Sequence, residues 1–328
     1  MDVLSDVISA LRVGRPGSER VEWYSPWSQR FADQPGTAGF LVVLQGTCWL
    51  IEEASPPVRL DPGDLVFSPQ GNGYALADSA DTFLIGQSKA TSVPRHAVGR
   101  ADGAEPPTRD PGGRPHAVTL CGGYRLAPHP LHPLLRELPA TIHIPARPGR
   151  HPELRAAVDM LGAELDSRRR PGTDALVAVL LDMLLLCSLR AWFEEHRDTG
   201  TAANWGAALA DPGLSTALNA IHDNPAHPWT VQELADKARM SRATLSRRFT
   251  ILIRQSPLAY LTWWRMNLAA QLLETEPSAP LAAVASRVGY TSEFAFATAF
   301  KRHFDLSPGR YRRRATAPPH EQPGPPGQ

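Results

Sequence analysis

The stretch WTVQELADKARMSRATLSRRFTILI, residues 229–253, decides the fold of the C-terminal third of this chain. Thr230 and Ser241 are typical N-cap residues, and each precedes a run in which apolar residues recur at three- and four-residue spacing. Only Arg239-Met240 separates the two runs. The pattern predicts a helix-turn-helix unit, whose second helix is the element that enters the major groove of DNA.

The predicted second helix, Arg242–Ile253, has two unlike faces. One face is apolar and is expected to belong to the core. The other face carries short or cationic side chains, which can reach base edges and phosphate groups. The candidate DNA-binding residues on this face are Arg242, Ala243, Ser246 and Arg247.

The same pattern recurs about 51 residues later in the chain. Leu281–Arg287 predicts a first helix, Gly289-Tyr290 a turn, and Ser292–Phe304 a second helix. A long helix over Pro257–Glu274 is expected to join the two units. Two recognition helices on one rigid connector can enter successive major grooves, about 34 Å apart.

Charge is distributed unevenly along the chain. Residues 213–314 contain 14 Lys and Arg against 7 Asp and Glu, a net charge of +7, whereas the whole chain carries only +1. A basic C-terminal block beside a mildly acidic remainder is typical of a phosphate-binding module fused to another domain. Core helices without any DNA-binding role would explain one such pattern. The repeat, the local charge and the run Arg310–Arg314 favour DNA binding.

Length and composition indicate a folded chain of two domains, with 328 residues of which 42% are hydrophobic. Residues 1–10 lack a cationic segment, so no signal peptide is expected. The most apolar segment, Leu176–Leu189, is short for a membrane span and contains Asp182, which predicts a buried helix and no membrane association. Three cysteines without a CxxC pair fit a reducing environment, and the expected location is cytoplasmic.

The N-terminal half has a different pattern, with short apolar runs separated by turn residues. The strand-like runs are Phe40–Leu44, Cys48–Ile51, Leu65–Phe67 and Ala117–Tyr124. Such short, evenly spaced runs predict a small antiparallel barrel or sandwich. Helical spacing follows over Glu153–Asp166 and Thr173–His196.

The C-terminal segments Trp229–Leu273 and Leu281–Arg312 closely resemble the AraC/XylS family of bacterial regulators. The matching positions are Ser241, Arg247, Phe249, Ser256-Pro257, Tyr260-Leu261, Val288-Gly289-Tyr290, Phe300-Lys301-Arg302 and Ser307–Arg312. The resemblance implies a sequence-specific, DNA-binding transcription regulator, in which Ala243, Ser246 and Arg247 sit where family members contact bases. Double-stranded DNA is the implied partner, and RNA polymerase is a further candidate.

The second recognition helix departs from the family pattern. Its groove-facing candidates are Glu293, Phe294, Ala297 and Thr298. Many relatives have Arg at the position of Thr298, and without that bidentate donor its base reading should be weaker. We therefore expect the first unit to carry most of the specificity and the second to add a phosphate contact through Lys301. Arg239 and Arg254 replace glycines that are usual in the family, which costs stability if either has a positive φ.

The N-terminal half resembles the cupin-type sensor domain of one subgroup of this family. The matching segments are Gly46–Leu50, Asp61–Asp64, Ser68–Gly71, Leu120–Tyr124 and His129-Pro130-Leu131. The resemblance implies a small β-barrel that senses a ligand, followed by helices that commonly mediate dimerisation. It makes an unknown small-molecule effector and a homodimer the expected partners.

The expected fold class is α+β multidomain, with a cupin-like β-barrel and following helices before an all-α double helix-turn-helix domain. The expected boundaries are 1–200 for the sensor and dimerisation domain, 201–212 for a linker, 213–314 for the DNA-binding domain and 315–328 for a disordered tail. The outer face of the helix Thr173–His196 is the candidate dimer surface, with a purely internal role as the alternative.

A metal-dependent cupin enzyme with an appended binding domain is the competing hypothesis. Leu41 and Tyr74 stand where such enzymes often carry histidine ligands. The alternative histidines, none with ligand-like spacing, are His116, His129, His132 and His143. No nucleophile–base pair stands out either. We therefore expect no metal, no cofactor and no enzymatic activity.

Two kinds of signal are candidates for the sensor domain. Trp23, Trp27 and Tyr74 are candidates for an apolar ligand pocket, with barrel core as the alternative. Cys48 and Cys121 are candidate redox residues, since relatives with this sensor domain include oxidant-responsive regulators. Buried cysteines are usually inert, so their exposure decides between these alternatives.

Overall fold

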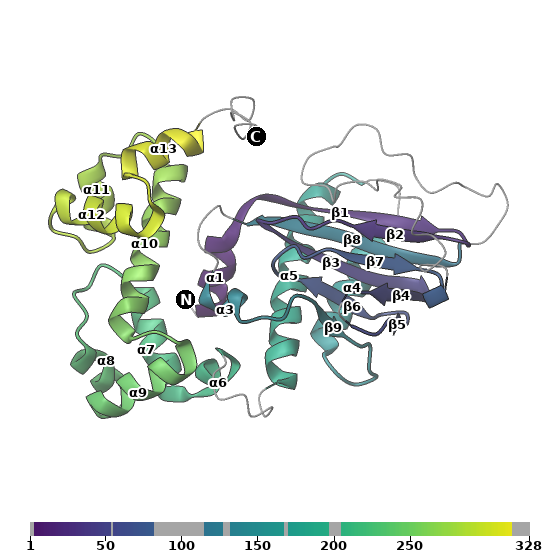
Figure 1. The fold of residues 1–328 in the computed structure, drawn as a ribbon, viewed down its shortest axis with the longest axis horizontal. Coiled ribbons are helices and arrows are strands. Elements are labelled where there is room, and N and C mark those ends of the chain that lie inside the picture. Colours follow the sequence, from purple (N-terminus) through teal and green to yellow (C-terminus); the bar gives the residue numbers. More distant parts are fainter. Residues whose placement is uncertain are drawn as a thin grey trace. The chain divides into compact units, whose positions relative to one another are not determined.

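The computed structural model of the protein describes residues 3–53, 55–81, 115–126, 132–166, 170–196 and 205–316 (Figure 1). The chain divides into two compact units. Residues 11–199 form one, called the β unit below, and residues 1–10 with 200–328 form the other, called the helical unit.

The β unit contains two antiparallel sheets. Its strands are β1 (Arg12–Trp23), β2 (Ser28–Phe31), β3 (Thr37–Gly46), β4 (Cys48–Ile51), β5 (Val58–Leu60), β6 (Leu65–Ser68), β7 (Tyr74–Ala77), β8 (Ala117–Leu126) and β9 (Ile142–Ile144). One sheet has the order β1-β8-β3-β6-β9 and the other β2-β7-β4-β5. The four strand-like runs expected from the sequence lie within β3, β4, β6 and β8.

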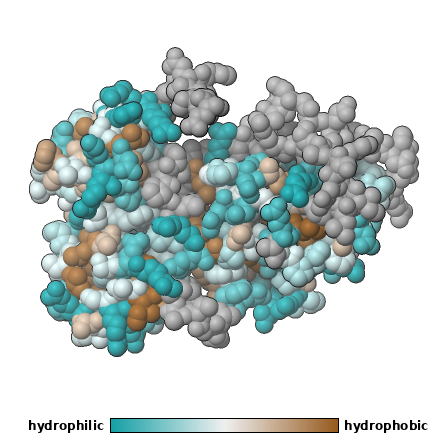
Figure 2. All heavy atoms as spheres, in the orientation of Figure 1, coloured by the Kyte–Doolittle hydropathy of each residue, from teal (hydrophilic) through white to brown (hydrophobic). Residues whose placement is uncertain are grey.

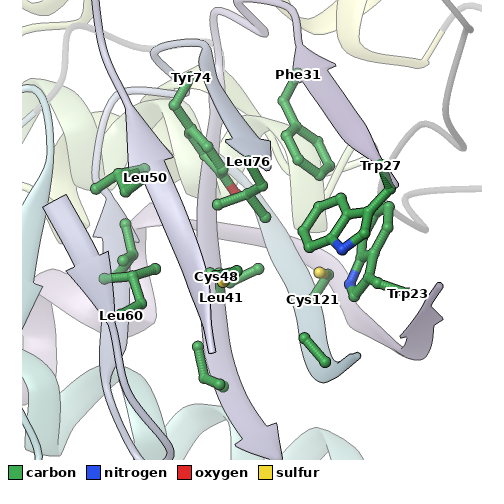
Figure 3. Close-up of a cluster of buried hydrophobic side chains, with 13 residues drawn as sticks. Trp23, Trp27, Phe31, Leu41, Cys48, Leu50, Leu60, Tyr74, Leu76 and Cys121 are labelled. Atoms are coloured by element: carbon green, nitrogen blue, oxygen red, sulfur yellow. The ribbon is translucent and has the colours of Figure 1, made fainter. Parts of the chain in front are cut away.

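The core of the β unit lies between the two sheets, and side chains from both sheets meet there (Figure 3). Cys48 and Leu50 of β4 point inward while their neighbours along the strand are more exposed, as strand alternation requires. Gly122 of β8 leaves room for the ring of its cross-strand neighbour Phe40 on β3, because a Cβ at this residue would lie 2.4 Å from that ring.

Helices α3 (Pro133–Arg136), α4 (Pro152–Asp166) and α5 (Thr173–Glu195) follow the strands. The last two pack against each other and against β1, and the hydroxyl of Tyr124 on β8 donates to the carbonyl of Leu181. The expectation that the apolar segment 176–189 is a buried helix is only partly right. Leu176 is 42% exposed and Val179 63% exposed, so one face of α5 packs inward and another is open.

Among the described residues, α5 alone has the length and apolar composition that a membrane crossing requires. A core helix of a soluble protein meets the same two criteria, and the packing of α5 on α4 and β1 is of that kind. Over most of its visible face the molecule presents hydrophilic side chains, with hydrophobic ones in small patches (Figure 2).

The helical unit is all-α in its described residues. Its helices are α1 (Val3–Leu11), α6 (Trp205–Ala210), α7 (Pro212–Asp223), α8 (Val231–Lys237), α9 (Arg242–Ile253), α10 (Pro257–Thr275), α11 (Leu281–Arg287), α12 (Glu293–Phe304) and α13 (Pro308–Thr316). The long helix α10 joins a group formed by α7, α8 and α9 to a second group formed by α11, α12 and α13 (Figure 1). The α+β architecture expected from the sequence is confirmed.

The unit boundaries differ from the expected ones at three places. Residues 1–10, which form most of α1, cluster with the helical unit, whereas the expected N-terminal domain includes them. The expected linker, 201–212, contains α6, whose Trp205 is buried. The expected tail begins inside α13, and its residues 317–328 lie outside the described part of the chain.

Helix α1 is held in the helical unit by apolar packing and by one polar network. Val3 and Val7 are fully buried, and Asp6 approaches Nδ1 of His222 on α7 at 3.1 Å. The other ring nitrogen of His222 lies 2.8 Å from the hydroxyl of Tyr260 on α10. One histidine therefore connects three helices that are far apart in the sequence.

Candidate nucleic-acid interface

The first helix-turn-helix unit is formed by local capping and a small core. Thr230 and Glu233 form a reciprocal capping box at the start of α8, with distances of 2.8 and 3.1 Å. Ser241 caps α9 by accepting from the backbone amide of Thr244 at 3.1 Å. Leu234, Leu245 and Phe249 are fully buried between the helices. These contacts fix α9 so that its opposite face is open.

The open face of α9 carries two exposed arginines, Arg242 and Arg247. Arg242, Ala243 and Arg247 are exposed, and Ser246 is half-buried beside them. Neighbouring Arg248 differs, since its guanidinium is 2.7 Å from the carboxylate of Asp211. Among the residues that the structure describes, Arg242 and Arg247 take part in no ion pair. Their guanidinium groups are free to bind phosphate groups or guanine edges.

The second unit repeats the first with an offset of 51 residues from the recognition helix onward. Ser292 caps α12 as Ser241 caps α9, by accepting from a backbone amide at 3.3 Å. Phe300 is buried as Phe249 is, and α13 begins at a proline as α10 does. The expected start of the helix at Ser292 was one residue early because this residue is the cap.

The two recognition helices have chemically unlike open faces. At equivalent positions, Arg242, Ala243, Ser246 and Arg247 of α9 are replaced in α12 by Glu293, Phe294, Ala297 and Thr298. Phe294 is 82% exposed. The hydroxyl of Thr298 donates to the carbonyl of Phe294 at 2.9 Å. Lys301 is exposed one turn further on, which leaves a single cation on this face among the candidate residues.

Arg265 of α10 connects the two helix-turn-helix groups, and the sequence offered no signal for this role. Its Nε and Nη2 atoms donate to the carbonyls of Pro225 and His227, at 2.7 and 2.8 Å. Its guanidinium also lies over the ring of Tyr290 in the second turn, 5.8 Å from the centroid. Gly289 permits this approach, because a Cβ there would lie 2.5 Å from the carbonyl oxygen of Ala226.

Two arginines occupy left-handed backbone positions in this region. Arg239 has φ 53° in the first turn and Arg254 has φ 62° at the end of α9. The second unit has Gly289 in the corresponding turn, also at positive φ. Both arginines therefore have the positive φ that the sequence comparison with family glycines raised as a possibility.

Replacing Arg239 or Arg254 with glycine is expected to raise the free energy of unfolding by about 0.5–1 kcal/mol per site, because glycine adopts positive φ without a Cβ penalty. Urea unfolding followed by circular dichroism measures the change. Arg248→Gly is the control, because this residue lies inside α9, where glycine should cost about 1 kcal/mol. Destabilisation of the same size at all three positions would contradict the prediction.

The three candidates for a ligand pocket in the β unit differ in their surroundings. Trp23 and Trp27 are buried and stacked at 4.3 Å between ring centroids, so they are part of the core (Figure 3). The indole Nε1 of Trp27 has no hydrogen-bond partner among the described residues. Tyr74 belongs to the same buried cluster, and it also lines a surface cavity of about 530 Å³. The other residues at this cavity are Arg30, Phe31, Ala32, Asp33, Ile51, Glu52, Glu53, Gly73 and Ala75.

The redox candidates Cys48 and Cys121 are both buried between the sheets (Figure 3). Burial raises the pKa of each thiol to about 12, and their proximity adds to the rise for Cys48. Each is therefore a neutral thiol at physiological pH, a state that reacts slowly with oxidants because the thiolate is the nucleophile.

Two of the candidate metal ligands, His132 and His143, have structural contacts of their own. Nδ1 of His132 accepts from the amide of Leu134 at the start of α3. His143 is 2.9 Å from Asp64. Burial by itself would raise the pKa of Asp64, but hydrogen bonds from His143 and from two backbone amides lower it. His116 is exposed, and His129 lies outside the described residues. No group of three possible metal ligands occurs in the described part of the chain.

A repeated helix-turn-helix on one connecting helix, with free arginines on the first recognition helix, defines a DNA-binding protein. Family comparison agrees on both parts of the chain. Residues 2–194 match a cupin family, and residues 234–314 match a helix-turn-helix domain family.

Relatives with known names extend this result to the whole chain. The chain is 33% identical to an AraC-like transcription regulator of Streptomyces lividans, over 97% of this chain and all of that protein. It is 31% identical to the HTH-type transcriptional regulator AlkR of Acinetobacter baylyi, over 96% of this chain and all of that protein. It is also 35% identical to the RCS-specific transcriptional activator RclR of Escherichia coli, over 60% of this chain and 67% of that protein. The chain belongs to the AraC-like family of DNA-binding transcription regulators.

Proposed function

We propose that this regulator recognises its operator mainly through α9, with Arg242 and Arg247 as the principal contacts. The observation that carries the proposal is that both guanidinium groups are exposed and in no ion pair among the described residues, whereas Arg248 is paired with Asp211. Arginine binds guanine through two hydrogen bonds to its major-groove edge, which is the commonest specific contact between protein and DNA.

Genomic footprinting of the purified protein tests this function. Selective protection of a small number of sites, with affinity at least about 10³-fold above that for random DNA at the same salt concentration, is expected for a specific regulator. Binding without preference for any sequence would overturn the proposal. Sites next to promoters would support RNA polymerase as a second partner and a location with the chromosome in the cytoplasm.

The β unit is proposed to control DNA binding in response to a small molecule. The cavity lined by Phe31 and Tyr74, of about 530 Å³, has the size of a small-ligand site. Oxidation of Cys48 or Cys121 is the second candidate signal. The Escherichia coli relative favours it, because its name describes an RCS-specific activator. It has less support, because burial keeps both thiols neutral.

A homodimer formed through α5 is also proposed. Leu176, Val179, Met183 and Leu186 recur at three- and four-residue spacing on the open side of this helix. Asp174 lies at one end of the stripe and Arg190 at the other, and neither takes part in an ion pair within the described ranges. Antiparallel packing of two copies would cover the apolar stripe and bring these opposite charges together.

Sedimentation at micromolar concentration tests the dimer. The unmodified chain is expected to sediment as a dimer, and Val179→Asp as a monomer, because the change puts a charge into the proposed interface. Leu258→Asp is the matched control, since Leu258 is an exposed apolar residue of the helical unit at 40% exposure. An unmodified monomer, or equal effects of the two substitutions, would refute the dimer surface.

A further inference from the structure

Phe294 is an unusual residue for a helix that faces DNA. It is 82% exposed, more than any other large hydrophobic residue on the described surface. Single exposed apolar residues are common and need no explanation by themselves. This one, however, is the second residue of α12 and occupies the position that Ala243 has in α9, where the resemblance to the family implies a base contact.

The residues around Phe294 make the open face of α12 apolar at its N-terminal end. Ala295 is exposed and Ala297 half-buried. Thr298, one turn further on, uses its only hydroxyl proton in the hydrogen bond to the carbonyl of Phe294. The face therefore offers a ring and methyl groups to the DNA, and its described residues at this end include no guanidinium or side-chain amide group that could donate to a base edge.

The exposed charges of α12 differ between its two ends: Glu293 lies beside Phe294, and Lys301 lies further along the helix. Glu293 is exposed beside Phe294, and its carboxylate is repelled by phosphate groups. Lys301 is exposed seven residues after Phe294, which is two helical turns along the same face. The arrangement directs Lys301 to the backbone and leaves the N-terminal end of α12 to the bases.

Thymine is the base that an apolar side chain recognises in the major groove. Its C5-methyl group is the only apolar group that the four bases present there, and phenylalanine is among the residues that contact it. We propose that α12 reads thymine through contact between the Phe294 ring and this methyl group. The inference rests on the proposed function, since it requires that α12 enters the groove of the operator.

Deoxyuridine tests the contact, because it lacks only the methyl group and keeps every hydrogen-bonding group of thymidine. Each thymidine of the footprinted operator would be replaced in turn, and the dissociation constants measured at constant salt. The unmodified protein is expected to bind about three- to tenfold more weakly when one or two particular thymidines lose the methyl group, as the loss of one buried apolar contact predicts.

The variant Phe294→Ala is expected to bind the thymidine and deoxyuridine operators equally well at those positions. Phe294→Leu, which keeps an apolar side chain, should retain part of the difference. Since Phe294 is exposed, unchanged circular dichroism spectra would show that both variants fold. Sensitivity to deoxyuridine elsewhere in the operator should be the same in all three proteins.

Each other outcome has a distinct meaning. Operator binding that is insensitive to every deoxyuridine overturns the thymine contact and leaves the proposed function intact. The same holds if Phe294→Ala remains sensitive, or if it binds all operators like the unmodified protein, as expected for a residue that contacts a protein partner. Loss of all preference for the operator over random DNA in the unmodified chain would instead overturn the proposed function.

Discussion

Arg247→Ala is expected to weaken binding to the operator by about 10- to 100-fold, while binding to random DNA falls only a few-fold. The reason is that a bidentate arginine–guanine contact contributes about 1–3 kcal/mol of discrimination against other bases, and a phosphate contact contributes none. The measurement is the ratio of dissociation constants for operator and random DNA at one salt concentration.

Two further substitutions serve as controls for Arg247→Ala. Arg248→Ala removes the same charge from the next residue, but Arg248 is held by Asp211 at 2.7 Å. Thr298→Ala removes the side chain at the equivalent position of α12, where the hydroxyl is bonded to the backbone. Both should change the ratio by less than about threefold, as residues without a base contact do. A loss for Thr298→Ala equal to that for Arg247→Ala would refute the ranking of the two recognition helices.

Val7→Asp in α1 is expected to destabilise the DNA-binding unit, although this residue lies more than 200 positions before α7 and its partners. Val7 is fully buried in the helical unit. A carboxylate there would be desolvated without a partner, which costs more than about 3 kcal/mol. Amide exchange in peptides of α7 and α10 should therefore become roughly 100-fold faster or more.

The same substitution at an exposed valine is the matched control. Val179 on α5 is 63% exposed and belongs to the β unit, so Val179→Asp should leave exchange in α7 and α10 unchanged even though it disrupts the proposed dimer. Asp6→Asn keeps the shape of the side chain but removes its charge opposite His222, and it should give an intermediate effect. Unchanged exchange in α7 for Val7→Asp would show that α1 is not part of this unit.

Two chain connections link the β unit to the helical unit. The chain passes from α1 directly into β1 at residues 11–12, and it returns to the helical unit after residue 199. The β unit is therefore joined to the helical unit at both of its ends. Removal of residues 1–11 would cut one of two connections and also expose the apolar face that α1 covers.

The double helix-turn-helix could be predicted from the sequence because its determinants are local. N-cap residues such as Thr230 and Ser241, and apolar residues one turn apart, act on neighbouring residues of the same helix. The bounds of α9 and α11 were therefore correct to the residue. The backbone strain at Arg239 and Arg254 was also predictable, because a glycine-type turn keeps its conformation when another residue replaces the glycine.

Pairing across long sequence separations could not be predicted. Arg248 was not among the candidate DNA-binding residues, and its ion pair with Asp211, 37 positions earlier, is visible only in the folded chain. Trp23 and Trp27 were candidates for a ligand pocket, but residues from distant strands, such as Cys121, enclose them in the core. Cys48 and Cys121 become neutral thiols only because two sheets enclose them.

The class of this protein, the order of its β-rich and helical parts and the unlike chemistry of its two recognition helices could be read from the sequence alone. Periodicity, caps and motif residues specify those properties over a few turns of chain. The packing of α1 in the helical unit, through contacts between Asp6, His222 and Tyr260, could be seen only in the folded chain. The physical reason is that such contacts join residues up to 216 positions apart, and their partners exist only once the chain has folded.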